Sequence, residues 1–113
     1  MKESIENKPK HALVTGGSRG IGKAVCIQLA KDTDYHVLIN YNSNKLEALN
    51  TLKEVKSVGG NGEILQFNVV NVDEVKSVLD AWNERNKDAV IEVLVNNAGI
   101  TKDGLFMWMP QND

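Results

Sequence analysis

The chain has 113 residues, enough for one domain and too few for two of ordinary size. Its composition, 42% apolar and 25% charged with only two prolines, excludes a disordered, collagen-like or coiled-coil protein. The 13 basic and 15 acidic residues leave a formal net charge of −2 without a long block of either sign, which argues against nucleic acid and acidic membrane surfaces as partners.

The first predicted unit is a strand, a glycine-rich turn and a helix. Residues 1–10 are charged, and we expect them to form a flexible N-terminus. An apolar run at 12–15 then enters the glycine cluster 16–22. Behind the turn, apolar residues recur at helical spacing, at Ile21, Ala24, Val25 and Leu29.

A second strand and helix follow directly. Residues 36–39 form an apolar run, and Asn44 with Glu47 has the spacing of a capping box, in which side chains bind the free N–H groups of a new helix. The apolar stripe of that helix consists of Ala48, Leu49, Leu52 and Val55. Gly59-Gly60 predicts its end, because glycine readily adopts the positive φ of a C-terminal cap.

The pattern continues with a third strand, a third helix and a fourth strand. Residues 63–69 alternate and then run apolar as a strand does, and Asn71 with Glu74 repeats the capping-box spacing. The helix behind them has one apolar face, made of Val75, Val78, Leu79 and Trp82. Residues 90–95 form the fourth strand and lead into Asn96-Asn97-Ala98-Gly99.

The alternation of strands and helices predicts an α/β fold with a parallel sheet, because each strand-helix-strand unit crosses over right-handed. We expect about four strands and three helices in a single domain over residues 1–113. The apolar residues 105–109 stand near the end of the chain with no further element to cover them. We therefore expect the chain to be a truncated piece of a longer domain.

Three further features predict a cytoplasmic protein with no membrane partner. The apolar runs fall far short of the ~20 residues that a membrane span needs. Residues 1–10 lack the hydrophobic segment of a signal peptide. The single cysteine, Cys26, cannot form an internal disulfide, which fits a reducing compartment.

The glycine cluster has the layout of a phosphate-binding loop. Glycines allow the backbone to approach a ligand closely, and the free N–H groups at the start of a helix attract an anion. The spacing Thr-Gly-x-x-x-Gly-x-Gly, with Gly16, Gly20 and Gly22, differs from both the G-x-G-x-x-G fingerprint and the P-loop. Because the cluster joins a strand to a helix, it predicts a dinucleotide site. The alternative is a turn used only for tight packing of helix against strand.

The residues behind the second strand favour NADP over NAD. Dinucleotide sites of this layout often carry an acidic residue there, which binds the ribose hydroxyls of NAD. This chain instead has Asn40-Tyr41-Asn42-Ser43, so no carboxylate repels a 2′-phosphate. Arg19, inside the glycine loop, supplies a guanidinium suited to phosphate. In the alternative interpretation, Arg19 is a solvated surface charge.

Two motifs together resemble the short-chain dehydrogenase/reductase family. They are Thr15-Gly16-Gly17-Ser18-Arg19-Gly20-Ile21-Gly22 and Asn96-Asn97-Ala98-Gly99, each at the end of a predicted strand. Within that family, the segment 100–107 and the Asn40-Tyr41 step resemble the 3-oxoacyl-[acyl-carrier-protein] reductases in particular. The match covers nearly all of the chain after Lys10, and only about the first half of such an enzyme.

The resemblance implies a Rossmann-type doubly wound parallel sheet, of which this chain is the N-terminal portion, and the cofactor NADP(H). It implies four groups of cofactor-binding residues. The pyrophosphate would be held by Gly16, Gly17, Ser18, Arg19, Gly20, Ile21 and Gly22, with Ser18 and Arg19 on the side of the ribose phosphate. The adenosine ribose would lie beside Asn40, Tyr41, Asn42 and Ser43, and the adenine beside Asn68 and Val69. The nicotinamide ribose would border Asn96, Asn97, Ala98 and Gly99, and Asn96 or Asn97 would tie neighbouring strands together.

The resemblance also implies that the catalytic residues are not in this chain. In the family, a serine polarises the substrate carbonyl, a tyrosine donates the proton and a lysine four residues later lowers the pKa of that tyrosine. All of them would lie beyond Asp113. Tyr41 and Lys45 match the tyrosine-lysine spacing, but they follow the second strand, where the adenosine would bind. We interpret them as adenosine-side or surface residues, and we expect no catalytic residue in this chain.

The remaining chemically versatile residues are interpreted as structural. His11 and His36 have no partner at metal-ligand spacing, so no metal site is expected. Cys26 and Trp82 fall on helical stripes and are expected in the core. The run Phe106-Met107-Trp108-Met109 fits burial under a further segment, or contact with a substrate or subunit.

The sequence thus predicts the cofactor-binding half of an NADPH-dependent reductase. By resemblance, its substrate would be a 3-oxoacyl group on acyl carrier protein, reduced to a 3-hydroxyacyl group in fatty acid biosynthesis. The complete enzyme would be a homo-oligomer, a tetramer, and the 113-residue chain alone would be inactive. The alternative is a non-catalytic dinucleotide-binding module or redox sensor.

Overall fold

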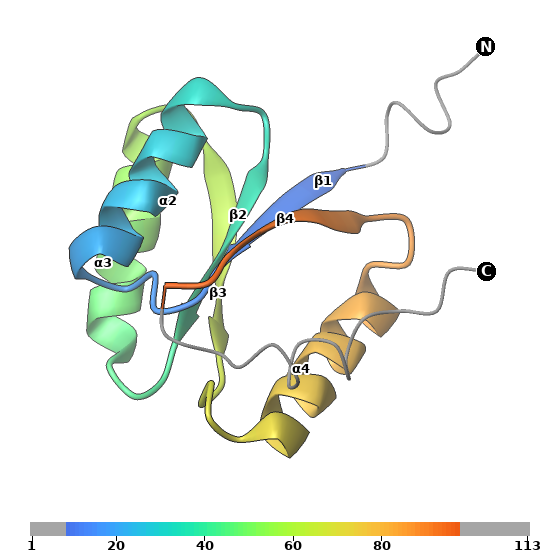
Figure 1. Cartoon of the computed structure of the whole chain (residues 1–113). Coiled ribbons are helices and arrows are strands. Elements are labelled where there is room, and N and C mark those ends of the chain that lie inside the picture. Colours follow the sequence, from blue (N-terminus) through green and yellow to red (C-terminus); the bar gives the residue numbers. More distant parts are fainter. Residues whose placement is uncertain (1–8, 98–113) are drawn as a thin grey trace, which may run out of the picture.

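The structure is a computed structural model, and it describes residues 9–97 (Figure 1). Strands and helices alternate along the chain as β1 (Lys10–Val14), α2 (Gly20–Asp32), β2 (His36–Tyr41), α3 (Lys45–Ser57), β3 (Asn61–Gln66), α4 (Val72–Arg85) and β4 (Val90–Val95). Lys10, the last residue of the segment expected to be flexible, is thus the first residue of β1, while residues 1–8 lie outside the described range. None of the helices within 9–97 is long and apolar enough to cross a membrane.

The four strands form one parallel sheet in the order β3-β2-β1-β4. From β1 the chain moves outward through β2 to β3, and it then returns to place β4 on the other side of β1. In Figure 1, α2 and α3 cover one face of the sheet and α4 covers the other. The predicted α/β class, with four strands and three helices in the described part of the chain, is confirmed.

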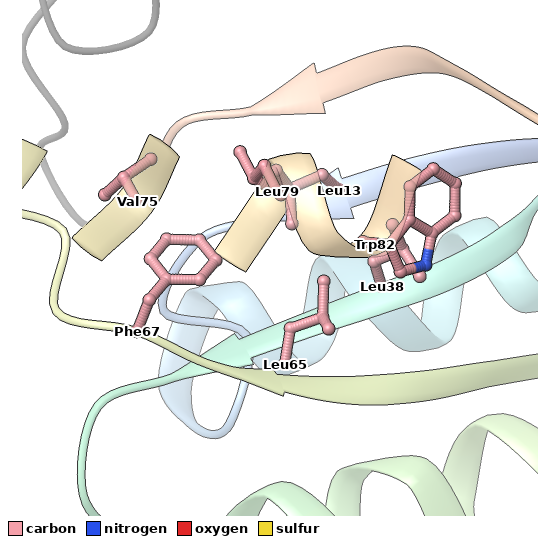
Figure 2. Close-up of a cluster of buried hydrophobic side chains, with 7 residues drawn as sticks. All are labelled: Leu13, Leu38, Leu65, Phe67, Val75, Leu79 and Trp82. Carbon is pink, nitrogen blue, oxygen red and sulfur yellow. The ribbon is translucent and has the colours of Figure 1, made fainter. Parts of the chain in front are cut away.

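Covering both faces of the sheet explains why its central strands are apolar without alternation. On one face, α4 packs against the strands in a cluster formed by Leu13, Leu38, Leu65, Phe67, Val75, Leu79 and Trp82 (Figure 2). On the other face, α2 and α3 cover a second cluster formed by Val14, Cys26, Ala30, Val37, Ile39 and Val55. Neighbouring residues of one strand therefore belong to opposite clusters, as Leu13 and Val14 do.

The apolar stripes predicted for the helices are correct for α4 and partly wrong for α2 and α3. In α4, Val75, Leu79 and Trp82 are buried as expected. In α2, Ile21 is 75% exposed, and the buried residues are the small ones, Gly22, Cys26 and Ala30. Their spacing of four residues forms one narrow stripe, along which the helix lies close to the sheet. In α3, Leu49 was expected in the core but is 41% exposed. Thr51, which was not expected there, is fully buried.

The structure shows the predicted asparagine caps and glycine end, but only the asparagine half of each predicted capping box. The side chains of Asn44 and Asn71 accept hydrogen bonds from the backbone N–H groups of Glu47 and Glu74, both at 3.1 Å. The end of α3 has the two backbone bonds of a Schellman motif, from Gly59 N–H to Lys56 and from Gly60 N–H to Val55. Gly59 has a φ of +94°, the conformation for which glycine is favoured at this place.

The third strand begins and ends earlier than predicted, at Asn61 and Gln66 instead of 63 and 69. Its length follows from pairing with β2, because the register runs from His36 opposite Asn61 to Tyr41 opposite Gln66. Beyond that strand, the chain turns at Asn68, whose side-chain oxygen accepts the N–H of Val70. The predicted fourth strand, 90–95, has the bounds that the structure shows.

Candidate binding site at the carboxyl edge of the sheet

A hollow of about 280 Å³ opens at the carboxyl ends of β1, β2 and β3. It gathers most of the residues that the sequence assigned to the glycine loop, the ribose and the adenine. Its lining consists of Gly16, Ser18, Arg19, Asn40, Tyr41, Asn42, Ser43, Asn44, Phe67, Asn68 and Val69. The hollow lies beside β1, where the order of strand addition reverses: β2 and β3 lie on one side of β1 and β4 lies on the other. Parallel α/β sheets bind ligands at such a point.

The other predicted site residues lie beside the hollow or outside the described range. Gly17, Gly20, Ile21 and Gly22 belong to the same loop and to the start of α2, but they do not line the hollow. Asn96 and Asn97 follow β4 on the far side of β1. Ala98 and Gly99, like the segment 105–109, lie outside residues 9–97.

The glycines of the loop serve distinct purposes. Gly16 and Gly20 both have a φ of +63°, which side chains other than glycine rarely adopt. A Cβ atom on Gly22 would lie 2.1 Å from the carbonyl oxygen of Gly16, a distance that backbone atoms cannot tolerate. The loop is thus tightly folded on the first turn of α2, and the packing role left open by the sequence is real for Gly22.

The N-terminus of α2 has several features that favour a bound anion. Arg19 is the N-cap residue without a capping bond from its side chain, and the first turn contains no acidic residue. Within the described residues, the backbone N–H groups of Arg19, Gly20 and Ile21 have no hydrogen-bond partner. These donors and the positive end of the helix dipole favour a phosphate group at this position.

The residues that line the hollow include a positively charged side chain, Arg19, and no negatively charged one. The Arg19 side chain is exposed and makes no ion pair with any residue of the described segment 9–97. No Asp or Glu is among the residues that line the hollow. A phosphate next to Arg19 would therefore meet a free guanidinium and neutral neighbours, and it would meet no carboxylate.

Asn40 lines the hollow, but its side chain is committed to the protein. It is buried, its Oδ1 accepts the N–H of Gly16 at 3.0 Å, and its Nδ2 donates to the carbonyl oxygens of Leu65 and Phe67 at 3.3 and 3.1 Å. The side chain therefore ties the glycine loop and the ends of β2 and β3 together. This changes the expected role of Asn40 from a neutral donor beside the ribose to a residue that shapes the site, because its amide has no donor left over.

Asn68, one of the two predicted adenine-side residues, is held by Glu74, a contact that the sequence analysis missed. The N–H of Asn68 donates to the Glu74 carboxylate at 3.1 Å. Glu74 was expected to close a capping box on Asn71, and instead it fixes the turn after β3. The capping-box spacing pointed to this residue, but it could not show which N–H group the carboxylate binds.

Asn96 and Asn97, which follow β4, both contact residues that follow β1. The Nδ2 of Asn97 donates to the carbonyl oxygen of Gly16 at 3.3 Å, and the Oδ1 of Asn96 lies 3.4 Å from the hydroxyl oxygen of Thr15. Thr15 reinforces the link, because its hydroxyl donates to Val95 at 3.4 Å. The resemblance implied such a tie for Asn96 or Asn97, and the structure shows contacts of this kind from both.

The remaining side chains considered for catalysis or metal binding are Cys26, the possible metal ligands, Tyr41 and Lys45. Burial raises the pKa of Cys26 to about 12, so its thiol is not a nucleophile near neutral pH. In the described part of the chain, no group of three His, Cys, Asp or Glu side chains is placed to hold a metal ion. Tyr41 ends β2 and lines the hollow, and Lys45 begins α3, both on the β2 side of β1.

The arrangement has clear relatives. The family model for short chain dehydrogenases matches residues 10–113. The 3-oxoacyl-[acyl-carrier-protein] reductase FabG of Staphylococcus aureus strain Mu50 is 41% identical over 104 residues, which are 92% of this chain and 41% of that protein. The 3-oxoacyl-[acyl-carrier-protein] reductase of Synechocystis is 43% identical over 106 residues, 90% of this chain and 40% of that protein. The chain thus spans about two fifths of the length of these curated relatives.

Solved structures show the same fold. The promiscuous reductase LugOII, which catalyses keto-reduction at C1 during lugdunomycin biosynthesis, has a TM-score of 0.66 and 34% identity, over 81% of this chain and 38% of that one. A Burkholderia cenocepacia dehydrogenase with bound NADP has a TM-score of 0.68 over 88% of this chain and 41% of that one. At 21% identity, the latter likeness concerns the fold alone.

Proposed function

The chain belongs to the short-chain dehydrogenase family, and from this premise we propose that it is the NADPH-binding part of a reductase. The observation that carries the proposal is the set of N–H groups at the start of α2 that have no partner within residues 9–97. They lie beside a hollow lined by the Arg19 guanidinium, which makes no ion pair within the same residues. The N–H groups of Arg19, Gly20 and Ile21 would bind the diphosphate of the cofactor. Arg19 would bind the 2′-phosphate that distinguishes NADPH from NADH.

The remaining contacts follow from the shape of the site. Tyr41, Asn42 and Ser43 line the part of the hollow next to β2 and would border the adenosine ribose. Asn68, whose N–H donates to Glu74, and Val69 would border the adenine. The residues 96–99 follow β4 and would lie next to the nicotinamide ribose, so the cofactor would cross the carboxyl end of β1.

The substrate we propose is a 3-oxoacyl group carried by acyl carrier protein. Support comes from the reductases of that name, which are 41% and 43% identical to this chain. Bound NADPH would supply a hydride to the ketone carbon, and with one proton on oxygen the product is a 3-hydroxyacyl group. This chain would bind and orient the cofactor. A cytoplasmic location and assembly into a homo-oligomer belong to the same proposal.

The chain by itself is expected to bind NADPH without turning it over. The sequence contains the spacing Tyr-x-x-x-Lys only at Tyr41 and Lys45, which lie on the adenosine side of the proposed site. A second candidate is a dinucleotide-binding module without catalysis. The two candidates agree about binding and differ about the reaction.

Binding is tested with NADPH and NADH titrated separately into the chain. We expect tighter binding of NADPH, and we expect Arg19→Ala to weaken it by about tenfold with a much smaller effect on NADH, because one charge-assisted hydrogen bond has roughly that worth. Lys31→Ala is the matched control, since Lys31 is an exposed cation in the last turn of the same helix. Equal losses for both cofactors would refute the assigned role of Arg19.

The reaction is tested with a chimera in which this chain replaces the 104 matching residues of the Staphylococcus aureus reductase. With a 3-oxoacyl thioester, we expect the chimera to oxidise NADPH in preference to NADH, and we expect Arg19→Ala to reduce that preference. Circular dichroism establishes that the chimera is folded. A folded chimera that binds NADPH but reduces no 3-oxoacyl thioester would favour the binding module.

A further inference from the structure

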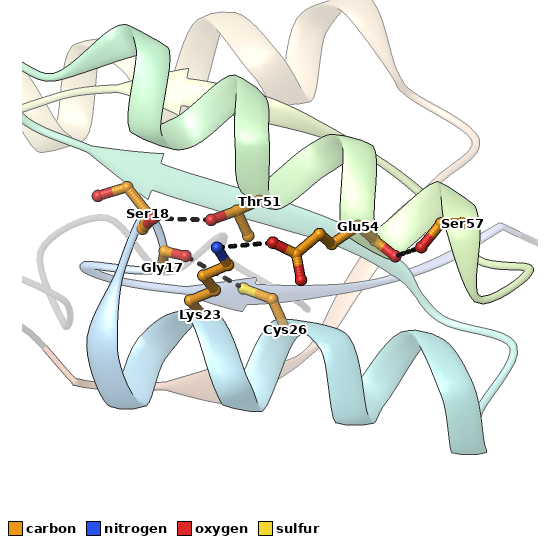
Figure 3. Close-up of polar contacts among 7 residues, drawn as sticks. All are labelled: Gly17, Ser18, Lys23, Cys26, Thr51, Glu54 and Ser57. Atoms are coloured by element: carbon orange, nitrogen blue, oxygen red, sulfur yellow. Dashed lines mark hydrogen bonds and ion pairs between the residues drawn. The ribbon is translucent and has the colours of Figure 1, made fainter.

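A buried hydroxyl on α3 contacts the glycine loop. Thr51 is fully buried, and its Oγ1 donates to the carbonyl oxygen of Ser18 at 2.7 Å (Figure 3). In the structure, Thr51 lies between Ala48 and Val55 on the buried face of α3. A buried hydroxyl costs free energy unless it is hydrogen-bonded, and here the bond leads to the loop that lines the hollow.

This bond fixes more than the carbonyl group it reaches. The Ser18 carbonyl and the Arg19 N–H belong to one peptide unit, which is planar and in which the two groups point in opposite directions. Holding the carbonyl oxygen toward α3 therefore directs the Arg19 N–H away from α3. That N–H is one of the donors without a partner in the described part of the chain.

A second contact joins α3 to α2, but it is weaker than the bond to Ser18. Lys23 of α2 and Glu54 of α3 form an ion pair at 2.7 Å (Figure 3). Its side chains are 29% and 50% exposed, and ion pairs so open to water contribute little. Behind the loop, the Cys26 thiol lies 3.8 Å from the carbonyl oxygen of Gly17. Among these three contacts, only that of Thr51 holds the peptide unit of Arg19.

We propose that Thr51 is a positioning residue that sets the affinity for NADPH and the preference over NADH. It acts by holding the Ser18-Arg19 peptide so that the Arg19 N–H and side chain meet the phosphate groups of the cofactor. This inference rests on the proposed function and goes beyond it, because Thr51 belongs to neither the hollow nor the glycine loop.

The test compares Thr51→Val with the unsubstituted chain. Valine has nearly the same shape but no hydroxyl, so the core stays filled while the bond to Ser18 is lost. We expect NADPH binding to weaken about fivefold, the worth of one hydrogen bond, and NADH binding to weaken less, so that the ratio of the two dissociation constants falls. Thr51→Ser restores the hydroxyl and should restore the ratio.

Ser57→Ala is the matched control, because it removes an exposed hydroxyl of the same helix that binds only the carbonyl oxygen of Glu54. A second measurement needs no cofactor. The amide NMR resonance of Arg19 should shift in Thr51→Val and stay unchanged in Ser57→Ala. If valine prevents folding, Thr51→Ala is assayed in the same two ways.

The outcomes separate the two proposals. If the unsubstituted chain does not bind NADPH, the proposed function fails and the role of Thr51 fails with it. If the chain prefers NADPH, and Thr51→Val keeps both that preference and the Arg19 resonance, only the role of Thr51 is refuted. Equal weakening of both cofactors would also refute it, because a purely structural residue acts in that way.

Discussion

Single residues at the carboxyl edge of the sheet show what a sequence can and cannot specify. Arg19 could be assigned from sequence because it lies inside a local glycine pattern. The role of Asn40 could not, because the carbonyl groups that bind its amide belong to Leu65 and Phe67, 25 and 27 positions further along the chain. Thr51 and Glu74 were missed for the same reason, since both act on backbone groups outside their own helices.

A second feature at the scale of residues is the histidine pair at the opposite edge of the sheet. His11 is buried, its Nδ1 has no partner among the described residues, and the rings of His36 and Trp82 lie 4.9 Å from its own. Burial, and next the neighbouring His36, lower the pKa of His11 below its ordinary value of 6.5, while the Pro9 carbonyl and Glu63 act in the opposite sense. A protonated His11 therefore disfavours the folded state.

The lowered pKa of His11 determines how the stability depends on pH. The unfolded chain binds the His11 proton at a higher pH than the folded chain does. The stability is therefore complete above the unfolded pKa of 6.5 and decreases as the pH falls below it. Urea unfolding at about pH 7.5 and about pH 5.5 should show the loss, and His11→Leu should lose less than the unsubstituted chain over the same interval.

His36→Gln serves as the control for this measurement. It removes the neighbouring charge but keeps the burial, which is the larger cause, so most of the pH dependence should remain. The unfolding midpoint of the unsubstituted chain could also be the same at both pH values. That result would contradict a lowered pKa of His11 in the folded state.

At the scale of elements, the contact between the glycine loop and α2 leaves no room for a side chain at Gly22. We expect Gly22→Ala to destabilise the chain by roughly 2 kcal/mol or more, because its Cβ would lie 2.1 Å from the Gly16 carbonyl oxygen. Urea unfolding measures the loss. Gly20→Ala is the matched comparison, with a positive φ but no atom within 4 Å of the new Cβ, and it should cost only about 1 kcal/mol.

Comparing the two substitutions therefore separates the cost of steric overlap, at Gly22, from the cost of a positive φ, at Gly20. Equal destabilisation by both substitutions would contradict the close packing of the loop on α2. A Gly22→Ala variant that unfolds like the unsubstituted chain would contradict it more strongly.

The elements themselves were mostly predictable, because their signals are local. Asn44 and Asn71 cap helices within three residues of themselves, and Gly59 ends α3. The inward faces of α2 and α3 were harder to predict. They depend on where small residues let a helix approach the sheet, so Cys26 is buried while Ile21 is exposed.

At the scale of the whole molecule, function depends on the strand order β3-β2-β1-β4. Periodicity predicts four strands and parallel pairing, but it does not specify which strand lies at the centre. The order places the ends of β1, β2 and β3 around one hollow and leaves β4 on the other side of β1. Residues far apart in sequence, such as Gly16, Asn40 and Asn97, thereby come to share hydrogen bonds.

The central claim of this account is that the glycine loop and the first turn of α2 bind the diphosphate of a nicotinamide dinucleotide. The most direct measurement is a titration of the isotopically labelled chain with NADPH, followed through its backbone amide resonances. We predict saturable shifts concentrated in residues 16–22, with smaller shifts at residues 41–43 and 68–69. Saturable binding that leaves residues 16–22 unchanged, or an absence of binding, would contradict the claim.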